Sequence, residues 1–332
     1  MLQLREDNRL IGETRYYVAE EEISMQVPDE VIKSVVFVCM QASKDAQQLK
    51  AVGTAFLVAL EEKEMNYTFG YIVTAKHVLN YIKAKSIGGN LFLRINDKNG
   101  GSIIATTNVN DWKVHPTDDA LDVAVLNLYL PIDTYDVIYI PANMATTPEI
   151  IKQQSIGIGD EVFITGLFVN HVGRKRNLPV IRSGNLSLMA EEPVYTTLGE
   201  TDAYLIEARS IGGLSGSPVF VYLGVVRHID KQVKFVTGER AGFSWLGIMH
   251  GHWKIPANTK DVIIEDENED QNGEKHTGIG IVVPATKVLE VINQPQYMDL
   301  RKKTLDELKK KNAPASDVAV ENISEEDFKK NS

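Results

Sequence analysis

The feature that most constrains this fold is a long series of short β-branched runs separated by turn-forming residues. The first series includes VIKSVVFVCM from Val31, AVGTAFLVAL from Ala51 and DVAVLNLYL from Asp122, with turn sequences such as GGN and DKNGG between runs. A second series begins with DEVFITGLF at Asp160 and ends with GIGIVVP at Gly278. Runs of this length and spacing are typical of all-β barrels or sandwiches. The sequence therefore predicts two consecutive β units of similar size.

The domain boundaries follow from where these runs begin and end. Residues 1–30 are polar and weakly patterned, and we expect them to form an N-terminal extension. The two β units are expected over 31–150 and 151–295. The second is closed by a helix predicted from PATKVLEVINQ, whose apolar residues recur at helical spacing after a proline suited to a first turn. Residues 296–332 are charged and predict a helical or disordered tail.

Composition and charge exclude several classes of partner. The net charge of -10 provides no basic face for nucleic acid, and no apolar run reaches the ~18 residues that a membrane span needs. The start, MLQLREDNRL, lacks a basic region followed by an apolar one, so no secretory signal is expected. The single cysteine, Cys39, allows no intrachain disulfide and ends an apolar run, which favours a buried thiol and a reducing compartment. We therefore expect a cytoplasmic protein with no nucleic-acid or membrane partner.

An acidic loop over residues 261–277 invites comparison with calcium sites. Asp266, Asn268 and Asp270 alternate as in an EF-hand, but the sixth position lacks the sharp-turn glycine and Thr277 replaces the closing glutamate. The sequence favours a solvated insertion.

The sequence GGLSGSPVF surrounds Ser215 with small residues. A serine hydroxyl is a weak nucleophile, so it needs a base within hydrogen-bond reach and an acid to orient that base. Gly213 and Gly216 allow a sharp turn in which free amides point at one spot, where an oxyanion could be held. The G-x-S-x-G elbow of α/β-hydrolases is excluded because Ser217 stands where it requires glycine.

A histidine and an aspartate upstream are candidates for the base and the acid. His77 ends the apolar run GYIVTAKHV, where a strand passes into a short turn. Asp122 enters a fully apolar strand, and an ionised carboxylate there needs a strong partner, which an imidazole would supply. The order His77, Asp122, Ser215 is that of the chymotrypsin-type triad.

At these residues the chain resembles the trypsin-like serine peptidases of the chymotrypsin fold, most closely the peptidase domain of the HtrA/DegP group. The similar segments lie within 31–293 in family order: VGTAFLV, VTAKHV, DVAVLNL, GDEVFITG, IRSGNLSLM, GLSGSPVF, WLGIMHG and GIGIVVPATKV. The resemblance implies an all-β fold of two six-stranded antiparallel β-barrels with a C-terminal helix. About forty residues remain after these segments, too few for the PDZ domain of that group, which needs ~80 to 100.

The resemblance also implies roles for individual residues. Ser215 would attack a peptide bond and form an acyl-enzyme, His77 would move the proton, and Asp122 would orient the imidazole. The amides of Gly213 and Ser215 would form the oxyanion hole, and no metal or organic cofactor would be needed. Leu214 stands where digestive relatives have an activating aspartate, so control by loop ordering or a regulatory protein partner is expected instead.

Substrate recognition is predicted on one strand and one loop. The segment Met249, His250 and Gly251 would run beside an extended protein or peptide substrate. Arg209 would sit at the base of the side-chain pocket and favour acidic residues, or would face outward into solvent. His250 and His252 could assist that pocket or form a metal pair, although two histidines without a third ligand are weak evidence for zinc.

Two alternatives to a constitutively active peptidase remain open. The chain could be a catalytically silent peptidase-fold module that binds extended peptide segments. It could also process one dedicated partner and stay silent until that partner arrives.

Overall fold

The computed structural model describes most of the two predicted β units. The described residues are 27–41, 49–86, 88–196, 198–208, 213–224, 226–229, 232–235, 242–255 and 275–312. Most of the predicted N-terminal extension, most of the acidic loop, the end of the charged tail and Arg209 lie outside them.

The N-terminal unit is a sheet in the order β5-β4-β1-β2-β3-β7-β6, with β8 paired to β2 in parallel. Six of its eight strands have four residues or more, whereas β6 and β8 have two each. Among the described residues, no pairing joins the end strands β5 and β6 into the closed six-stranded barrel that we expected, and β8 pairs with β2 off this path. The strands are β1 (Val35–Gln41), β2 (Leu49–Glu62), β3 (Tyr67–Thr74), β4 (Asn90–Asn96), β5 (Ser102–Asn108), β6 (Lys113–Val114), β7 (Ala124–Asn127) and β8 (Ile140–Pro141).

The C-terminal unit is a closed barrel of six antiparallel strands in the order β10-β13-β18-β17-β14-β9. This confirms the all-β class and the second predicted barrel. Two separate hairpins, β11–β12 and β15–β16, extend from it. The strands are β9 (Glu161–Gly166), β10 (Val180–Leu188), β11 (Val194–Thr196), β12 (Gly199–Thr201), β13 (Tyr204–Glu207), β14 (Pro218–Gly224), β15 (Val226–Ile229), β16 (Gln232–Phe235), β17 (Gly242–Ile255) and β18 (Lys275–Pro284).

One hydrophobic core joins the two units. It brings Phe56 and Tyr71 from the N-terminal sheet against Trp245 and Val283 from the barrel. The rings of Phe56 and Trp245, both fully buried, meet edge to face with centroids 5.6 Å apart. Because this core is shared, the seam between the units is a packed interior that fixes how residues on its two sides face one another.

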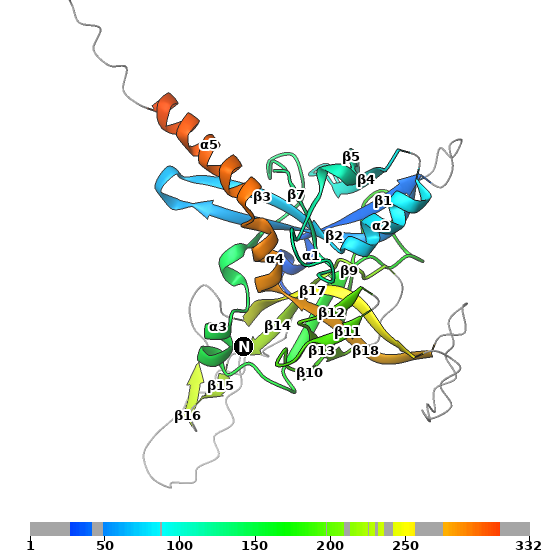
Figure 1. Cartoon of the computed structure of the whole chain (residues 1–332), viewed down its shortest axis with the longest axis vertical. Coiled ribbons are helices and arrows are strands. Elements are labelled where there is room, and N and C mark those ends of the chain that lie inside the picture. Colours follow the sequence, from blue (N-terminus) through cyan, green and yellow to red (C-terminus); the bar gives the residue numbers. More distant parts are fainter. Residues whose placement is uncertain are drawn as a thin grey trace, which may run out of the picture.

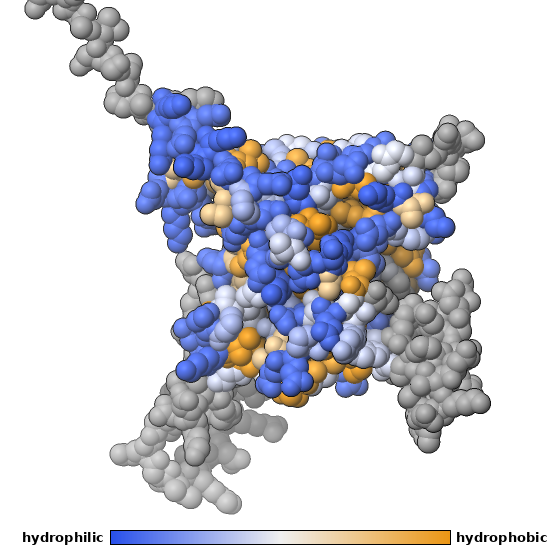
Figure 2. Space-filling view, viewed as in Figure 1, coloured by the Kyte–Doolittle hydropathy of each residue, from blue (hydrophilic) through white to orange (hydrophobic). Residues whose placement is uncertain are grey.

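Short helices connect the strands, and two helices end the described chain (Figure 1). The predicted closing helix is α4, whose apolar face is buried. Helix α5 follows it, and Tyr297 at its start donates a hydrogen bond of 2.7 Å to the Val125 carbonyl. Its outer length projects from the body and is largely hydrophilic (Figure 2). The helices are α1 (Asp29–Ile32), α2 (Lys76–Lys85), α3 (Pro148–Gln154), α4 (Ala285–Ile292) and α5 (Pro295–Asn312), with 3-10 turns η1 (Lys63–Met65), η2 (Val109–Asp111) and η3 (Ala142–Met144).

A search of the described helices for a membrane span finds none that is both long and apolar enough.

Candidate active site

His77 lies in the first turn of α2, directly after β3. The sequence predicted a short turn here, but a helix forms because Val78, Leu79 and Ile82 recur at helical spacing and are buried. The helix begins after Ala75, which has no side chain able to cap it. The His77 amide instead donates to Asp122 Oδ1 at 2.8 Å, so a carboxylate from another part of the sheet satisfies one of the unpaired amides of the helix start.

Asp122 also holds the His77 ring. Its Oδ2 lies 2.6 Å from His77 Nδ1, which fixes the imidazole at both its backbone and its side chain. The Asp122 side chain is fully buried. Burial alone would raise the pKa of this carboxyl, but hydrogen bonds from His250 and His77 outweigh it and lower the pKa to about 2. Asp122 is therefore an anion at neutral pH.

The loop that leads into Asp122 is held by its own hydrogen bonds. Asp118 Oδ1 accepts the amides of Ala120 at 2.9 Å and Leu121 at 3.1 Å. From the start of α2, the Lys76 ammonium donates to the Asp119 carbonyl at 2.5 Å. These bonds tie the loop before Asp122 to the helix that carries His77.

Ser215 lies in a tight loop between the two units. Gly213 has φ +106° and Gly216 has φ +83°, conformations that residues with a Cβ rarely adopt. A Cβ on Gly216 would also lie 2.2 Å from the Thr54 carbonyl oxygen. The glycines therefore permit the sharp turn that the sequence indicated, and they also allow the loop to approach β2 closely.

Hydrogen bonds fix this loop to β2 on one side and β17 on the other. The Thr54 amide donates to the Ser215 carbonyl at 3.0 Å, and Thr54 Oγ1 donates to the Gly213 carbonyl at 2.9 Å. On the barrel side, the Gly216 amide donates to the Met249 carbonyl at 2.9 Å. Within the described part of the chain, no hydrogen bond uses the amide of Gly213 or that of Ser215. The predicted role of these two amides as an oxyanion hole remains a prediction.

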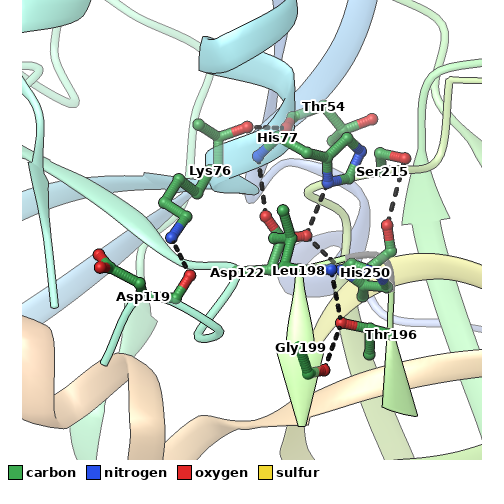
Figure 3. Close-up of polar contacts among 11 residues, drawn as sticks. Thr54, Lys76, His77, Asp119, Asp122, Thr196, Leu198, Gly199, Ser215 and His250 are labelled. Carbon is green, nitrogen blue, oxygen red and sulfur yellow. Dashed lines mark hydrogen bonds and ion pairs between the residues drawn. The ribbon is translucent and has the colours of Figure 1, made fainter. Parts of the chain in front are cut away.

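The Ser215 hydroxyl is directed at the main chain of β17. It donates to the His250 carbonyl at 3.4 Å, and Figure 3 shows this contact beside the paired His77 and Asp122. Among the described residues, Ser215 makes no hydrogen bond to His77. The structure thus brings His77 and Asp122 into direct contact, and it places Ser215 in the same site with its hydroxyl turned to another acceptor.

His250 is a residue of the site whose side-chain position the sequence did not indicate. Its Nδ1 lies 2.5 Å from Asp122 Oδ2, the same oxygen that contacts His77 Nδ1. The two imidazole rings meet nearly edge to face, with centroids 5.5 Å apart and planes at 73°. A register shift in the pairing of β17 with β18 falls between Met249 and Gly251. Such a bulge redirects the side chain at its centre.

The other predicted substrate-binding residues present their main chain rather than their side chains. Met249 is fully buried and packs in the barrel core, while Gly251 is half-buried. The predicted role of this strand in substrate binding remains a prediction. Arg209 lies outside the described residues.

Among the described residues, His77, Asp122 and His250 also form a group that could hold a metal ion. Each offers one ligand atom, and these atoms lie within 4.8 Å of one another.

Comparison with known proteins finds similarity of fold at low sequence identity. No family model matches the chain, and no curated protein matches it. The MamO protease domain from Magnetospirillum magneticum is 15% identical, with a TM-score of 0.43 over 78% of this chain and 96% of that chain. The active form of the Rv3671c protease from M. tuberculosis is 18% identical, with a TM-score of 0.40 over 79% of this chain and 80% of that chain. Both neighbours are proteases; the chemistry of this chain depends on the residues of its own site.

Proposed function

We propose that this protein is a serine endopeptidase in which Ser215 is the nucleophile, His77 the general base and Asp122 the carboxylate that orients it. The observation that supports this most directly is the double contact of Asp122 with the His77 amide and Nδ1, at 2.8 and 2.6 Å. Because the buried anion accepts from Nδ1–H, the other ring nitrogen, Nε2, keeps the lone pair that a base needs.

The reaction begins with a rotation of the Ser215 side chain. Its hydroxyl leaves the His250 carbonyl and donates to His77 Nε2, and Oγ attacks the substrate carbonyl carbon as its proton passes to Nε2. The resulting oxyanion accepts from the amides of Gly213 and Ser215, donors of a kind that contribute several kcal/mol to transition-state stabilisation.

The intermediate then collapses and breaks the peptide bond. His77 returns the proton to the leaving amine, and the acyl group stays on Ser215 Oγ. A water molecule, deprotonated by His77, attacks this ester, and the second tetrahedral intermediate releases the acid and restores the hydroxyl. These steps use residues of the chain and water alone.

The proposed substrate is an extended protein or peptide segment that pairs with the main chain of β17 near His250. A substrate amide that donates to the His250 carbonyl would take the place of the Ser215 hydroxyl there. Substrate binding would therefore release the nucleophile toward His77.

Control of activity is proposed to act through loop ordering or a regulatory partner. Leu214 is buried in the barrel core, so the position offers no charge for an activating ion pair. A cytoplasmic location and an HtrA-like peptidase domain belong to this same proposal.

A fluorophosphonate probe tests the proposal, because it labels a serine only when a base activates it. We expect labelling of the native protein and none of Ser215→Ala or His77→Ala. Ser217→Ala is the matched control: this serine is in the same loop, but its buried hydroxyl has no partner among the described residues, and labelling should persist. Labelling of Ser215→Ala, or none of the native protein even with peptide substrates, contradicts the peptidase function.

One observation favours a second candidate, a catalytically silent module that binds extended peptides. The recorded partner of the Ser215 hydroxyl is the His250 carbonyl and not His77. If that arrangement persists with peptide bound, the site would hold a peptide strand without cleaving it. Peptide binding to the native protein with no cleavage and no probe labelling would support this candidate.

A further inference from the structure

The Asp122 carboxylate is a buried anion without a permanent positive partner in the described part of the chain. Its two ion-pair partners there are His77 and His250, and an imidazole is charged only when protonated. The nearby Lys76 ammonium is used by the Asp119 carbonyl. Burying a carboxylate is costly unless a cation or several hydrogen bonds compensate it. In the described part of the chain its charge is compensated by three N–H groups, the His77 amide and the two imidazole Nδ1–H groups, none of which carries a permanent positive charge.

Two imidazole nitrogens converge on one oxygen of this carboxylate. His77 Nδ1 and His250 Nδ1 lie 2.6 and 2.5 Å from Asp122 Oδ2, at or below the short end of the usual range for N–H···O hydrogen bonds. Both rings must carry their proton on Nδ1 to donate there. A cation at this point would instead accept the lone pairs of all three groups.

We propose that His77, Asp122 and His250 form a binding site for a divalent transition-metal ion of the zinc class. Two imidazoles and one carboxylate are a donor set that zinc takes in proteins, and three protein ligands leave a fourth position open to water. The site that the sequence suggested for a histidine pair, His250 with His252, is replaced here by His250 with His77.

The ligands must move slightly to admit the ion. At metal–ligand distances of about 2.0 to 2.2 Å, two ligand atoms at a tetrahedral angle stand ~3.3 Å apart, so the nitrogens would move from Oδ2 by roughly 0.7 Å. His77, with 34% of its side chain exposed, can make this adjustment and gives the ion a route from solvent. The fully buried Asp122 carboxylate forms the fixed part, and the His250 ring, 10% exposed, must withdraw from it as well.

Metal binding would silence hydrolysis, a consequence that rests on the proposed peptidase function. When His77 Nδ1 gives its lone pair to the ion, Nε2 carries the ring proton and cannot accept the proton of Ser215. The same three residues would thus give two exclusive states, a metal-free state able to act as a base and a metal-bound state unable to do so.

The binding experiment uses Ser215→Ala, so that its outcome does not depend on catalysis. Isothermal titration with Zn²⁺ alone should give one ion per chain, and Co²⁺ should give the intense visible absorption of a four-coordinate site. Loss of second-shell groups typically weakens a metal site 10- to 100-fold. Removal of a direct ligand in His250→Ala or His77→Gln should therefore weaken binding by at least about 100-fold. His115→Gln, which removes a histidine paired with Glu290 at 3.6 Å, should leave binding unchanged.

Several outcomes would overturn the proposal. They are no saturable Zn²⁺ binding, binding that survives His250→Ala, or binding that is lost in His252→Gln. Because His77 is partly exposed, His77→Gln keeps the test valid if a variant at a buried ligand fails to fold. In the native protein, an active site that labels equally with and without saturating Zn²⁺ would overturn the silencing but not the metal site. Absence of probe labelling under all conditions would reject the peptidase while leaving the metal result intact.

Discussion

The N-terminal sheet and the C-terminal barrel contribute to the site with different degrees of constraint. The N-terminal unit supplies His77, from helix α2, and Asp122, just before β7; contacts of 2.8 and 2.6 Å join the His77 amide and Nδ1 to the fully buried Asp122 carboxylate. The barrel supplies Ser215, whose hydroxyl makes a long contact of 3.4 Å to a carbonyl. A buried anion must be paired, whereas a neutral hydroxyl loses little by changing acceptor. The fold thus fixes the proposed acid–base pair and leaves the side chain of the proposed nucleophile free to turn.

The largest effect should be a loss of catalytic rate when the contact between Asp122 and His77 is altered. We expect Asp122→Asn to lower kcat about 10⁴-fold, the loss found when the triad aspartate of a serine peptidase is changed in this way, because the imidazole adopts the wrong tautomer. The steady-state rate on a peptide substrate, with folding checked by circular dichroism, measures it. A loss below tenfold would mean that His250 or another group orients His77 without Asp122.

The next largest effect should be a loss of stability when the core shared by the two units is disrupted. Phe56→Ala removes a fully buried ring that packs against Trp245 across the units, and loss of a buried Phe costs about 3–5 kcal/mol in unfolding free energy. Chemical denaturation measures it, with Tyr67→Ala, an aromatic that is 37% exposed, as the control. Equal destabilisation by both changes would show that the shared core does not couple the units.

A smaller loss of stability should follow from removing the hydrogen bonds that hold the loop containing Ser215. Thr54 Oγ1 donates to the Gly213 carbonyl and accepts the Leu167 amide, each at 2.9 Å. Thr54→Val keeps the shape but removes both bonds, and we expect a cost of about 1–3 kcal/mol in unfolding free energy. Thr165→Val is the matched control, because the buried Thr165 hydroxyl has no partner among the described residues. If Thr165→Val destabilises the protein as much, the Thr54 bonds do not fix the loop.

Two features of the structure could be predicted from the sequence alone. The β-branched runs indicated the strands, and the closed barrel forms from the second series. An aspartate entering an apolar strand indicated that Asp122 needs a strong partner, which an imidazole would supply, because the cost of burying a charge does not depend on the details of the fold.

The position of the His250 side chain could not be predicted in this way. In a strand, a shift of one residue moves a side chain to the opposite face, and the bulge in β17 lies at this residue. Periodicity in the sequence does not reveal where a bulge falls. Likewise, the two-residue strands β6 and β8 carry too short a pattern to be read from sequence.

The smallest effect should be a change in the reactivity of Cys39. This residue lies in a second hydrophobic cluster between the two units, separate from the core that contains Phe56 and Trp245. The thiol packs with Phe37 of β1 and with Leu167, which follows β9, so it lies where the two units meet. Burial raises its pKa to about 11. Since the thiolate is the reactive form, we expect the native thiol to resist a disulfide reagent at pH 8 and to react faster in Phe56→Ala than in Tyr67→Ala.

The raised pKa of Cys39 also sets the sign of a pH effect. Between about pH 9 and pH 11 the unfolded chain releases the thiol proton while the folded chain retains it, so the contribution of Cys39 to stability is complete below pH 9 and is lost as the pH rises through 11. Denaturation curves of the native protein and Cys39→Ala should therefore converge over this interval, the variant cancelling the titration of tyrosines and lysines common to both. Curves that stay parallel would mean that the thiol titrates normally, and hence that solvent reaches Cys39 between β1 and Leu167.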